Sequence, residues 1–425
     1  MKKVLIITYY WPPSGGPGVQ RVLKFVKYLS SFGWQPIVMT VKNGNYPSID
    51  ESLVKEIPKT CKVFKTDIFE PINFYKSLTG KKKESIPTFV LSKSGKESLA
   101  EKLSKWVRAN IFIPDAKIGW AKYIVKEGLK IIEAEKPDLI FSSSPPHSLQ
   151  IGAMRLAKKT KISWVADFRD PWTNAFWQND ISRNIFSSLL DKRFEKLVFK
   201  NADGITTVSK TIGDFIFQMT KGNVHVLSNG FDESDFVFPK SQNDKFRITY
   251  TGTLGKDQSV LSFIKSIEQL PQNILSQVEI NFIGSFHDAI LDEIKSSAIS
   301  GLFKVQNSVS HEESIKRITN SDLLLLIIPN TKNNKGILTG KLFEYLATGN
   351  PILCYAPKDG DAAEIISETK SGQTFDYSEN SSNFILDLFN KHKSNEQFHS
   401  DRIAINKYSR KVLTEKLSNI FDELI

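Results

Sequence analysis

Residues Gly336–Leu353 read GILTGKLFEYLATGNPIL, and this stretch decides the fold of the second half of the chain. Between Asp322 and Pro329 the preceding chain is continuously apolar, which predicts a strand buried on both faces. Apolar residues at helical spacing then predict a helix that Gly349 ends, and the next strand starts at Pro351. The stretch therefore indicates a strand–loop–helix–strand unit of a parallel sheet.

The start of this helix is suited to an anion. Thr339, Gly340 and Lys341 lie in its first turn, where backbone N–H groups lack intrahelical partners and Lys341 adds a positive charge. Glu344 follows one turn later and has the reach to accept hydrogen bonds from a ribose. An ordinary βαβ unit in which Glu344 is merely solvated fits the same spacing.

The segment Lys341–Pro351 resembles the nucleotide-sugar-binding motif of retaining GT-B glycosyltransferases of family 4. The resemblance implies that Glu344 holds the donor ribose and that the start of the helix, from Thr339, contacts the donor. In that family a second Glu, eight residues upstream, usually contacts the sugar. This sequence has Gly336 there, a departure that concerns the donor sugar more than the fold.

The fold class expected from these patterns is α/β, with two Rossmann-like domains that face each other across a cleft. We expect an N-terminal, acceptor-side domain over 1–238, with an irregular insertion at about 42–115. A nucleotide-sugar-binding domain is expected over 239–402. The resemblance implies that a last helix, over 403–425, crosses back and packs on the first domain.

The chain begins with a strand, a glycine loop from Trp11 to Gly18 and a helix, the usual opening of a doubly wound sheet. The loop does not match GxGxxG, so no dinucleotide cofactor is expected. Glycines allow a ligand to approach the backbone closely. The resemblance implies that Gly15 and Gly16 contact the donor.

Two polar clusters follow neighbouring predicted strands of the first half. His147 comes after a Pro-Pro turn, and Asp167-Phe-Arg169-Asp170 ends the next strand. Because parallel strands end at the same edge, both clusters point to one crevice and are candidate catalytic residues. The alternatives are a core histidine and a structural ion pair. A similar arrangement lines the active site in the resembled glycosyltransferases.

The second half repeats the order of strand, loop and helix. The loop Thr251–Lys256 follows a predicted strand, and the resemblance implies that Gly252 and Lys256 bind the donor diphosphate. It also implies that Val309 lies near the nucleobase. Asp359-Gly-Asp361 matches the DxD metal signature of a different fold, but it precedes a helix. We therefore interpret Asp361 as an N-cap and expect no metal.

Composition is that of an ordinary soluble protein, with 40% hydrophobic and 24% charged residues. No apolar run reaches the length of a membrane span, and the start lacks the pattern of a signal peptide. Cys61 and Cys354 are the two cysteines, so a disulfide framework is not expected and a cytoplasmic location fits.

Part of the net charge of +11 is concentrated in one stretch. From Lys76 to Arg108 there are nine basic and three acidic residues, a net of +6. Motifs of nucleic-acid binding are missing, so that partner is not expected. A predicted basic helix that contains Trp106 favours a peripheral anionic membrane contact through 76–112. A helix packed on its domain with a solvated basic face is the alternative.

These features predict a retaining glycosyltransferase that uses a nucleotide sugar, UDP- or GDP-linked, as its substrate. The expected acceptor is a glycan or a lipid-linked molecule. The resemblance alone implies a role in cell-surface polysaccharide synthesis. A sugar-nucleotide epimerase of similar fold is one rival, with Asp167, Asp170 and Glu344 as its available carboxylates. An inactive nucleotide-sugar-binding module is the other.

Overall fold

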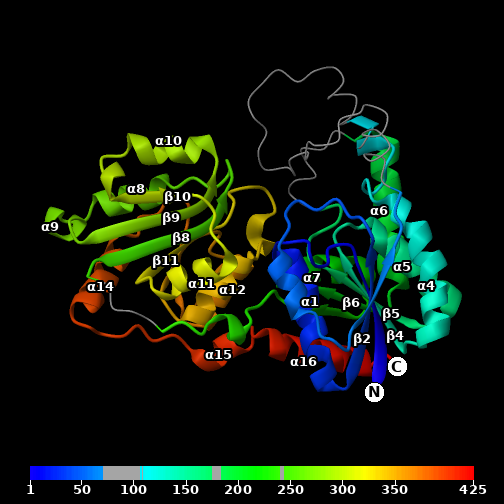
Figure 1. Cartoon of the computed structure of the whole chain (residues 1–425). Helices are drawn as coiled ribbons and strands as arrows, with labels where there is room; N and C mark the ends of the chain where they lie inside the picture. The colour runs from blue at the N-terminus through cyan, green and yellow to red at the C-terminus, as the bar shows by residue number, and fades with distance from the viewer. Residues whose placement is uncertain (70–105, 108, 175–182, 240–243) are drawn as a thin grey trace. The chain divides into compact units, whose positions relative to one another are not determined.

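The computed structural model describes residues 1–69, 106–107, 109–174, 183–239 and 244–425. The chain divides into unit 1, which comprises Met1–Ser228 and Leu413–Ile425, and unit 2, which comprises Asn229–Val412. Each unit contains one parallel sheet with helices packed on it (Figure 1). The predicted α/β class with two Rossmann-like domains is therefore confirmed, and each unit is described by itself below.

Among the described residues of unit 1, the sheet has the strand order β3-β2-β1-β4-β5-β6-β7. All pairs are parallel, and the order reverses between β1 and β4, as in doubly wound folds. The strands are β1 (Lys2–Thr8), β2 (Trp34–Val41), β3 (Lys62–Thr66), β4 (Leu139–Ser144), β5 (Ser163–Phe168), β6 (Gly204–Thr207) and β7 (Val224–Val226).

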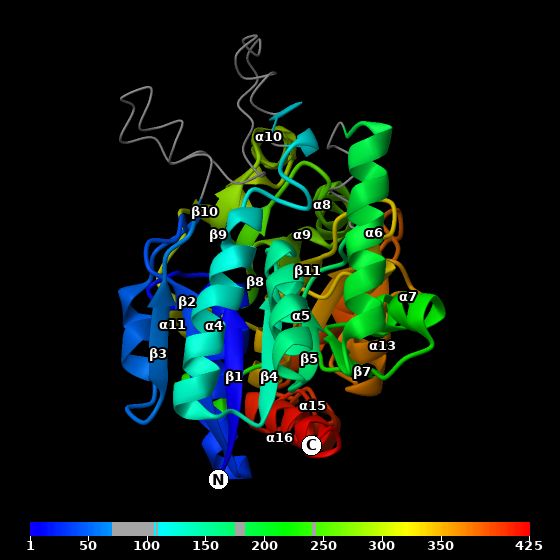
Figure 2. The ribbon, with the colours of Figure 1, turned by 90° about the vertical axis from the view of Figure 1, so that its right-hand side faces the viewer.

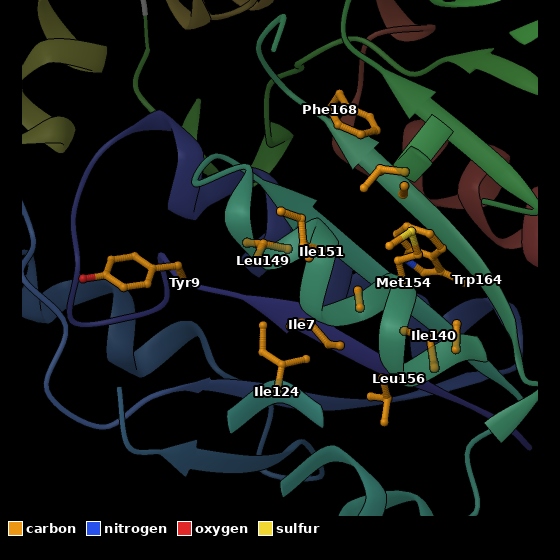
Figure 3. Close-up of a cluster of buried hydrophobic side chains, with 14 of the residues drawn as sticks. Ile7, Tyr9, Ile124, Ile140, Leu149, Ile151, Met154, Leu156, Trp164 and Phe168 are labelled. Atoms are coloured by element: carbon orange, nitrogen blue, oxygen red, sulfur yellow. The ribbon is translucent and has the colours of Figure 1, made fainter. Parts of the chain in front are cut away.

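Helices cover both faces of this sheet because its central strands are buried on both sides. Figure 2 shows α4 and α5 across one face, where their apolar side chains form a core with β1, β4 and β5 (Figure 3). Helices α1 and α16 (Arg410–Asp422) pack on the other face. The helical elements are α1 (Pro17–Leu29), η1 (Ser30–Phe32), η2 (Glu51–Glu56), η3 (Ile118–Trp120), α4 (Ala121–Glu135), α5 (Ser148–Thr160), α6 (Ile185–Asn201) and α7 (Lys210–Thr220).

One prediction for unit 1 is wrong. The insertion at about 42–115 was expected to be irregular, yet within it β3 pairs with β2 at the edge of the sheet. Its side chains Val63 and Phe64 are only half-buried and are flanked by lysines, so β3 lacks the continuous apolar run of the central strands. Residues 70–105 and 108, which include most of the basic stretch, lie outside the described residues.

In unit 2 the described residues form a second parallel sheet with the order β10-β9-β8-β11-β12-β13. Its strands are β8 (Phe246–Leu254), β9 (Val278–Phe286), β10 (Phe303–Gln306), β11 (Leu323–Ile327), β12 (Ile352–Tyr355) and β13 (Gly372–Phe375). Its helical elements are η5 (Glu233–Asp235), α8 (Leu261–Glu268), α9 (Gln272–Leu275), α10 (Asp288–Ser296), η6 (Ser300–Leu302), α11 (His311–Thr319), η7 (Asn334–Gly336), α12 (Gly340–Thr348), α13 (Asp361–Glu368), α14 (Ser382–Lys393) and α15 (Arg402–Asn406).

Three local predictions in the second half need correction. Gly252 lies inside β8 rather than in a loop, because β8 continues to Leu254 beside β9. Gly360 is the N-cap of α13, and Asp361 is its first helical residue. The expected last helix is split into α15 and α16 (Arg410–Asp422), with a bend where Phe231 and Ser409 form a bridge.

The final part of α16 belongs to unit 1. Phe421 is fully buried and meets the Trp34 ring edge-to-face, with ring centroids 5.2 Å apart. Leu413, Leu417 and Ile420 enter the same core. The predicted crossing of the last helix back to the first domain is therefore confirmed. None of the helices in the described part of the chain is long and apolar enough to span a bilayer.

Candidate active-site residues

Helix α12 in unit 2 carries the motif from which the fold was predicted. Gly349 ends the helix in the left-handed conformation (φ 71°), and the Arg402 guanidinium donates to the carbonyl oxygen of Ala347 at 3.2 Å. At the other end, Thr339 is the N-cap but makes no side-chain capping bond. The buried Thr339 Oγ1 atom has no hydrogen-bond partner among the described residues. This helix start therefore presents unused donors to a ligand.

Lys341 packs its side chain against Gly252. A Cβ added to Gly252 would lie 2.3 Å from Lys341 Cε, and Gly252 itself has φ +104°, a conformation that suits glycine. The Lys341 Nζ atom lies 5.1 Å from the centre of the Tyr250 ring and 3.5 Å from the Thr253 carbonyl oxygen. Burial lowers the pKa of Lys341, although Glu344 opposes the shift. Gly252 thus makes room for an ammonium group at the start of α12.

Glu344 lies one turn after Lys341 and close to α11. His311 stands between two carboxylates: its Nδ1 atom is 4.0 Å from Glu344 Oε1, and its Nε2 atom is 3.5 Å from Asp235 Oδ2. Burial raises the pKa of Glu344, and the charges of His311 and Lys341 oppose that rise. Val309, two residues before His311, is half-buried in the segment that leads into α11. The structure therefore brings the segment of Val309 close to Glu344.

The other predicted donor residues occupy different surroundings. Lys256 is exposed in the turn after β8. Gly336 is buried in η7, where the family has its second Glu. Beside it, Asn334 donates to the Pro329 carbonyl oxygen at 2.9 Å and lines a cavity of about 560 Å³ with Tyr377. Sequence reasoning missed this cavity because several separate loops form its wall.

In unit 1, Asp167 is part of a buried ion pair. Its carboxylate accepts from Arg21 Nη2 and Thr206 Oγ1, each at 2.8 Å, and from Ser143 Oγ at 2.7 Å. Burial raises the pKa of Asp167, but the Arg21 charge and these bonds outweigh it, so the pKa is lowered. Arg21 also donates to the Ser228 carbonyl oxygen at 2.9 Å.

Asp167 and Arg21 are both 0% exposed, so the Asp167 carboxylate is held inside unit 1 by its ion pair and is not presented to solvent. The sequence left open an ion pair within Asp167–Asp170, whereas the ion pair of Asp167 in the structure is with Arg21. Its partner Arg21 was not predicted, because a single arginine in an amphipathic helix has no signal that distinguishes it from a surface residue.

His147 precedes α5 at the carboxyl end of β4. Its ring stacks on Trp172, with centroids 5.0 Å apart and an interplanar angle of 7°. The Nδ1 atom lies 3.2 Å from Ser144 Oγ. Burial lowers the pKa of His147 to about 3. At neutral pH the imidazole is therefore uncharged and suited to hydrogen bonding rather than to proton abstraction.

Arg169 holds several loops of unit 1 together. Its Nε atom donates to the Ser144 carbonyl oxygen at 3.1 Å, and Nη2 donates to that of Pro145 at 2.9 Å. The guanidinium carbon lies 5.9 Å from the centre of the Tyr10 ring. A Cβ on Gly18 would lie only 1.7 Å from Arg169 Nη1, so this glycine makes space for the guanidinium.

Asp170 follows Arg169 at the same edge of the sheet and is half-buried. Burial raises the pKa of its carboxyl group, and the Arg169 charge opposes the rise.

The glycine loop after β1 lies at this edge too. Gly15 donates its N–H to the Ser48 carbonyl oxygen at 3.0 Å, and Gly16 is the N-cap of α1 at φ 98°. As at the start of α12, no described side chain accepts a hydrogen bond from the first N–H groups of α1.

Comparisons with known proteins agree with these two units. Residues 86–235 match the model of Glycosyltransferase Family 4. An uncharacterized glycosyltransferase of Methanocaldococcus jannaschii is 23% identical over 252 residues, which is 51% of this chain and 62% of the relative. The aligned part thus spans less than two thirds of that relative.

Two solved structures share the fold along the whole chain. Sucrose-phosphate synthase from Thermosynechococcus elongatus has a TM-score of 0.64 and 13% identity, covering 100% of this chain and 99% of its own. HepE from Anabaena, solved in complex with UDP-glucose, has a TM-score of 0.62 and 12% identity, with full coverage of both chains. At this identity the likeness shows the fold, which is GT-B, and the sequence match shows a resemblance to glycosyltransferases of family 4.

Proposed function

We propose that this chain, which has the GT-B fold and resembles family 4 glycosyltransferases, transfers a sugar from a nucleotide-sugar donor to an acceptor. The observation that carries the proposal is the start of α12. Lys341 is held there beside unused N–H groups, and Glu344 follows one turn later. A diphosphate needs the first two features and a ribose needs the third. The complex of the Anabaena protein with UDP-glucose supports UDP as the nucleotide, with GDP as the alternative.

The proposed reaction proceeds with retention and without a metal. The N–H groups of α12 and Lys341, with Lys256 from the turn after β8, stabilise the leaving diphosphate as negative charge develops on it. Neutral His147 donates or accepts a hydrogen bond with the transferred sugar, and Arg169 positions the loop that carries it. Asp167 contributes only by fixing β5 through Arg21. Retention is then attributed to attack of the acceptor on the face that the diphosphate leaves.

The proposed acceptor is a glycan or a lipid-linked molecule in cell-surface polysaccharide synthesis. We place the reaction in the cytoplasm, at the inner face of the membrane, where the unpaired Cys61 and Cys354 fit a reducing environment. The basic stretch within 76–112 remains a predicted contact with anionic lipid, and most of it lies outside the described residues.

The donor site is tested with Lys341→Ala. One charge-assisted contact is lost, so affinity for UDP or GDP should fall about tenfold to a hundredfold. Lys256→Ala should cost less because Lys256 is exposed. Lys358→Ala is the control, since Lys358 pairs with Glu379 in the same unit outside the proposed site. Calorimetry showing equal nucleotide affinity for Lys341→Ala and Lys358→Ala would remove the diphosphate assignment.

The reaction class is tested with labelled nucleotide sugars and a panel of acceptors. Transfer releases a nucleoside diphosphate and a glycoside whose anomeric configuration matches the donor, as NMR can determine. An isomerised donor without transfer would indicate the epimerase, for which burial of Asp167 leaves few accessible carboxylates. Binding without either product would indicate the inactive module.

A further inference from the structure

The first two turns of α6 present large apolar side chains to solvent. Ile185 is 77% exposed, Phe186 84% and Leu189 60%. Ile111, which is 60% exposed, lies nearby, because Asn110 accepts from the Asn184 N–H at 2.7 Å. Exposed apolar groups gathered in this way mark a contact surface rather than the scattered single residues of an ordinary protein face.

Basic side chains follow the apolar ones along the same helix. Lys192, Arg193 and Lys196 are exposed, whereas the two carboxylates of α6, Asp191 and Glu195, are buried. All residues of α6 are described, so its exposed surface is apolar for the first two turns and purely cationic for the next two. Figure 2 shows that the first turns of α6 extend beyond α5 within unit 1.

We propose that this face of α6 inserts its apolar first turns into an anionic lipid surface. The six residues from Ile185 to Leu190 span about 9 Å along the helix axis, so a helix that enters by its tip would place them within the boundary of about 5–10 Å where interfacial apolar groups lie. Lys192 and Arg193 then lie at the level of the lipid phosphates. Each such charge strengthens binding about fivefold at low salt. The apolar tip of the helix suits the acyl region of the bilayer, and the cations that follow it suit the anionic headgroups.

The surface is connected to the proposed active-site residues of unit 1. Trp172, on which His147 stacks, donates its indole N–H to Asp191 of α6 at 2.8 Å. Because α6 follows β5 and precedes β6 in a parallel sheet, it begins at the carboxyl edge where His147 lies. Docking of α6 therefore brings that edge of unit 1 toward the lipid.

The test uses the full chain and vesicles of phosphatidylcholine with or without phosphatidylglycerol. Ile185→Ser/Phe186→Ser should reduce sedimentation with anionic vesicles about tenfold or more, since the inserted groups are lost. Lys192→Glu/Arg193→Glu should remove the preference for anionic over neutral vesicles. Ile403→Ser is the matched control, because Ile403 is also 84% exposed but lies in unit 2.

Other occupants of the face give different results. The proposal would be overturned if Ile185→Ser/Phe186→Ser bound anionic vesicles like the wild type. It would also be overturned if only Lys81→Glu/Lys82→Glu/Lys83→Glu lost vesicle binding, since that result would assign binding to the basic stretch. Concentration-dependent dimers that only the α6 variant abolishes, without vesicle binding, would identify a second copy as the occupant. Sugar transfer is not part of the assay, so its outcome is independent of the proposed reaction.

Discussion

His147 is a residue whose environment sets its chemistry. Stacking on Trp172 and the contact with Ser144 leave the ring half-buried, and burial lowers its pKa from 6.5 to about 3. A histidine that stays neutral down to this pH is a poor general base near neutrality. Its proposed role as a hydrogen-bonding partner of the sugar agrees with that state.

The lowered pKa of His147 predicts a loss of stability in acid. Below pH 6.5 the unfolded chain binds a proton at His147, whereas the folded chain does not until about pH 3. The free energy of unfolding should therefore fall with decreasing pH in this window, by at most about 1.4 kcal/mol per pH unit. His147→Phe keeps an aromatic ring against Trp172 but cannot titrate. Denaturant unfolding at several pH values should give a flatter profile for the variant, and parallel profiles would contradict the assignment.

The positions of candidate residues could be predicted where the signal is local. Lys341 and Glu344 lie within one helical turn, so the motif and the helix were visible together. The pairing of Arg21 with Asp167 joins positions 146 residues apart, and Gly18 matters only because Arg169 reaches it. Such contacts depend on the tertiary structure, and a single sequence without an alignment contains no trace of them.

At the scale of elements, Arg169 joins the loops after β1, β4 and β5. The guanidinium lies close to Tyr10 of the first loop and to Gly18 in the first turn of α1, and it donates to two carbonyl oxygens of the second loop. The loop that contains Pro145 leads directly to His147. Displacing Arg169 should therefore displace His147 without unfolding the sheet.

Gly18→Ala tests this connection. Alanine in a helix is ordinarily favoured over glycine by about 1 kcal/mol, which offsets part of the lost Arg169 contacts, so the melting temperature should change little. Turnover should fall about tenfold to a hundredfold because the loops shift. Combination with Arg169→Lys should add little further loss. Gly301→Ala is the control, since no atom lies within 4 Å of its added Cβ. Full activity of Gly18→Ala would show that Arg169 does not position the loop.

Elements with strong local patterns were predicted well, and elements that depend on their neighbours were not. The apolar runs of β1 and β11 are buried throughout and were visible in the sequence. β3 is a five-residue edge strand whose main support is its pairing with β2. The division between α15 and α16 follows from a bridge to Phe231, which lies far away in the sequence.

At the scale of the whole molecule, the two units have the same doubly wound topology, but unit 1 is built from two separate parts of the chain. Unit 1 includes Leu413–Ile425, whose apolar side chains complete the face of its sheet that α1 covers. Unit 1 therefore depends on the end of the chain for its core. The residues Asn229–Val412 form unit 2 between the two parts.

This arrangement predicts that a substitution near the end of the chain destabilises unit 1 selectively. Phe421→Ala removes a fully buried ring that contacts Trp34 and Phe141, so the free energy of unfolding of unit 1 should fall by about 3–5 kcal/mol. Phe389→Ala is the matched comparison, because Phe389 packs on Phe246 in the core of unit 2. UDP, the nucleotide proposed to bind unit 2, should stabilise that unit by mass action and so identify its thermal transition. Phe421→Ala should lower the transition that UDP leaves unchanged, whereas Phe389→Ala should lower the one that UDP raises. If Phe421→Ala lowered the UDP-dependent transition instead, the end of α16 would not support unit 1 alone.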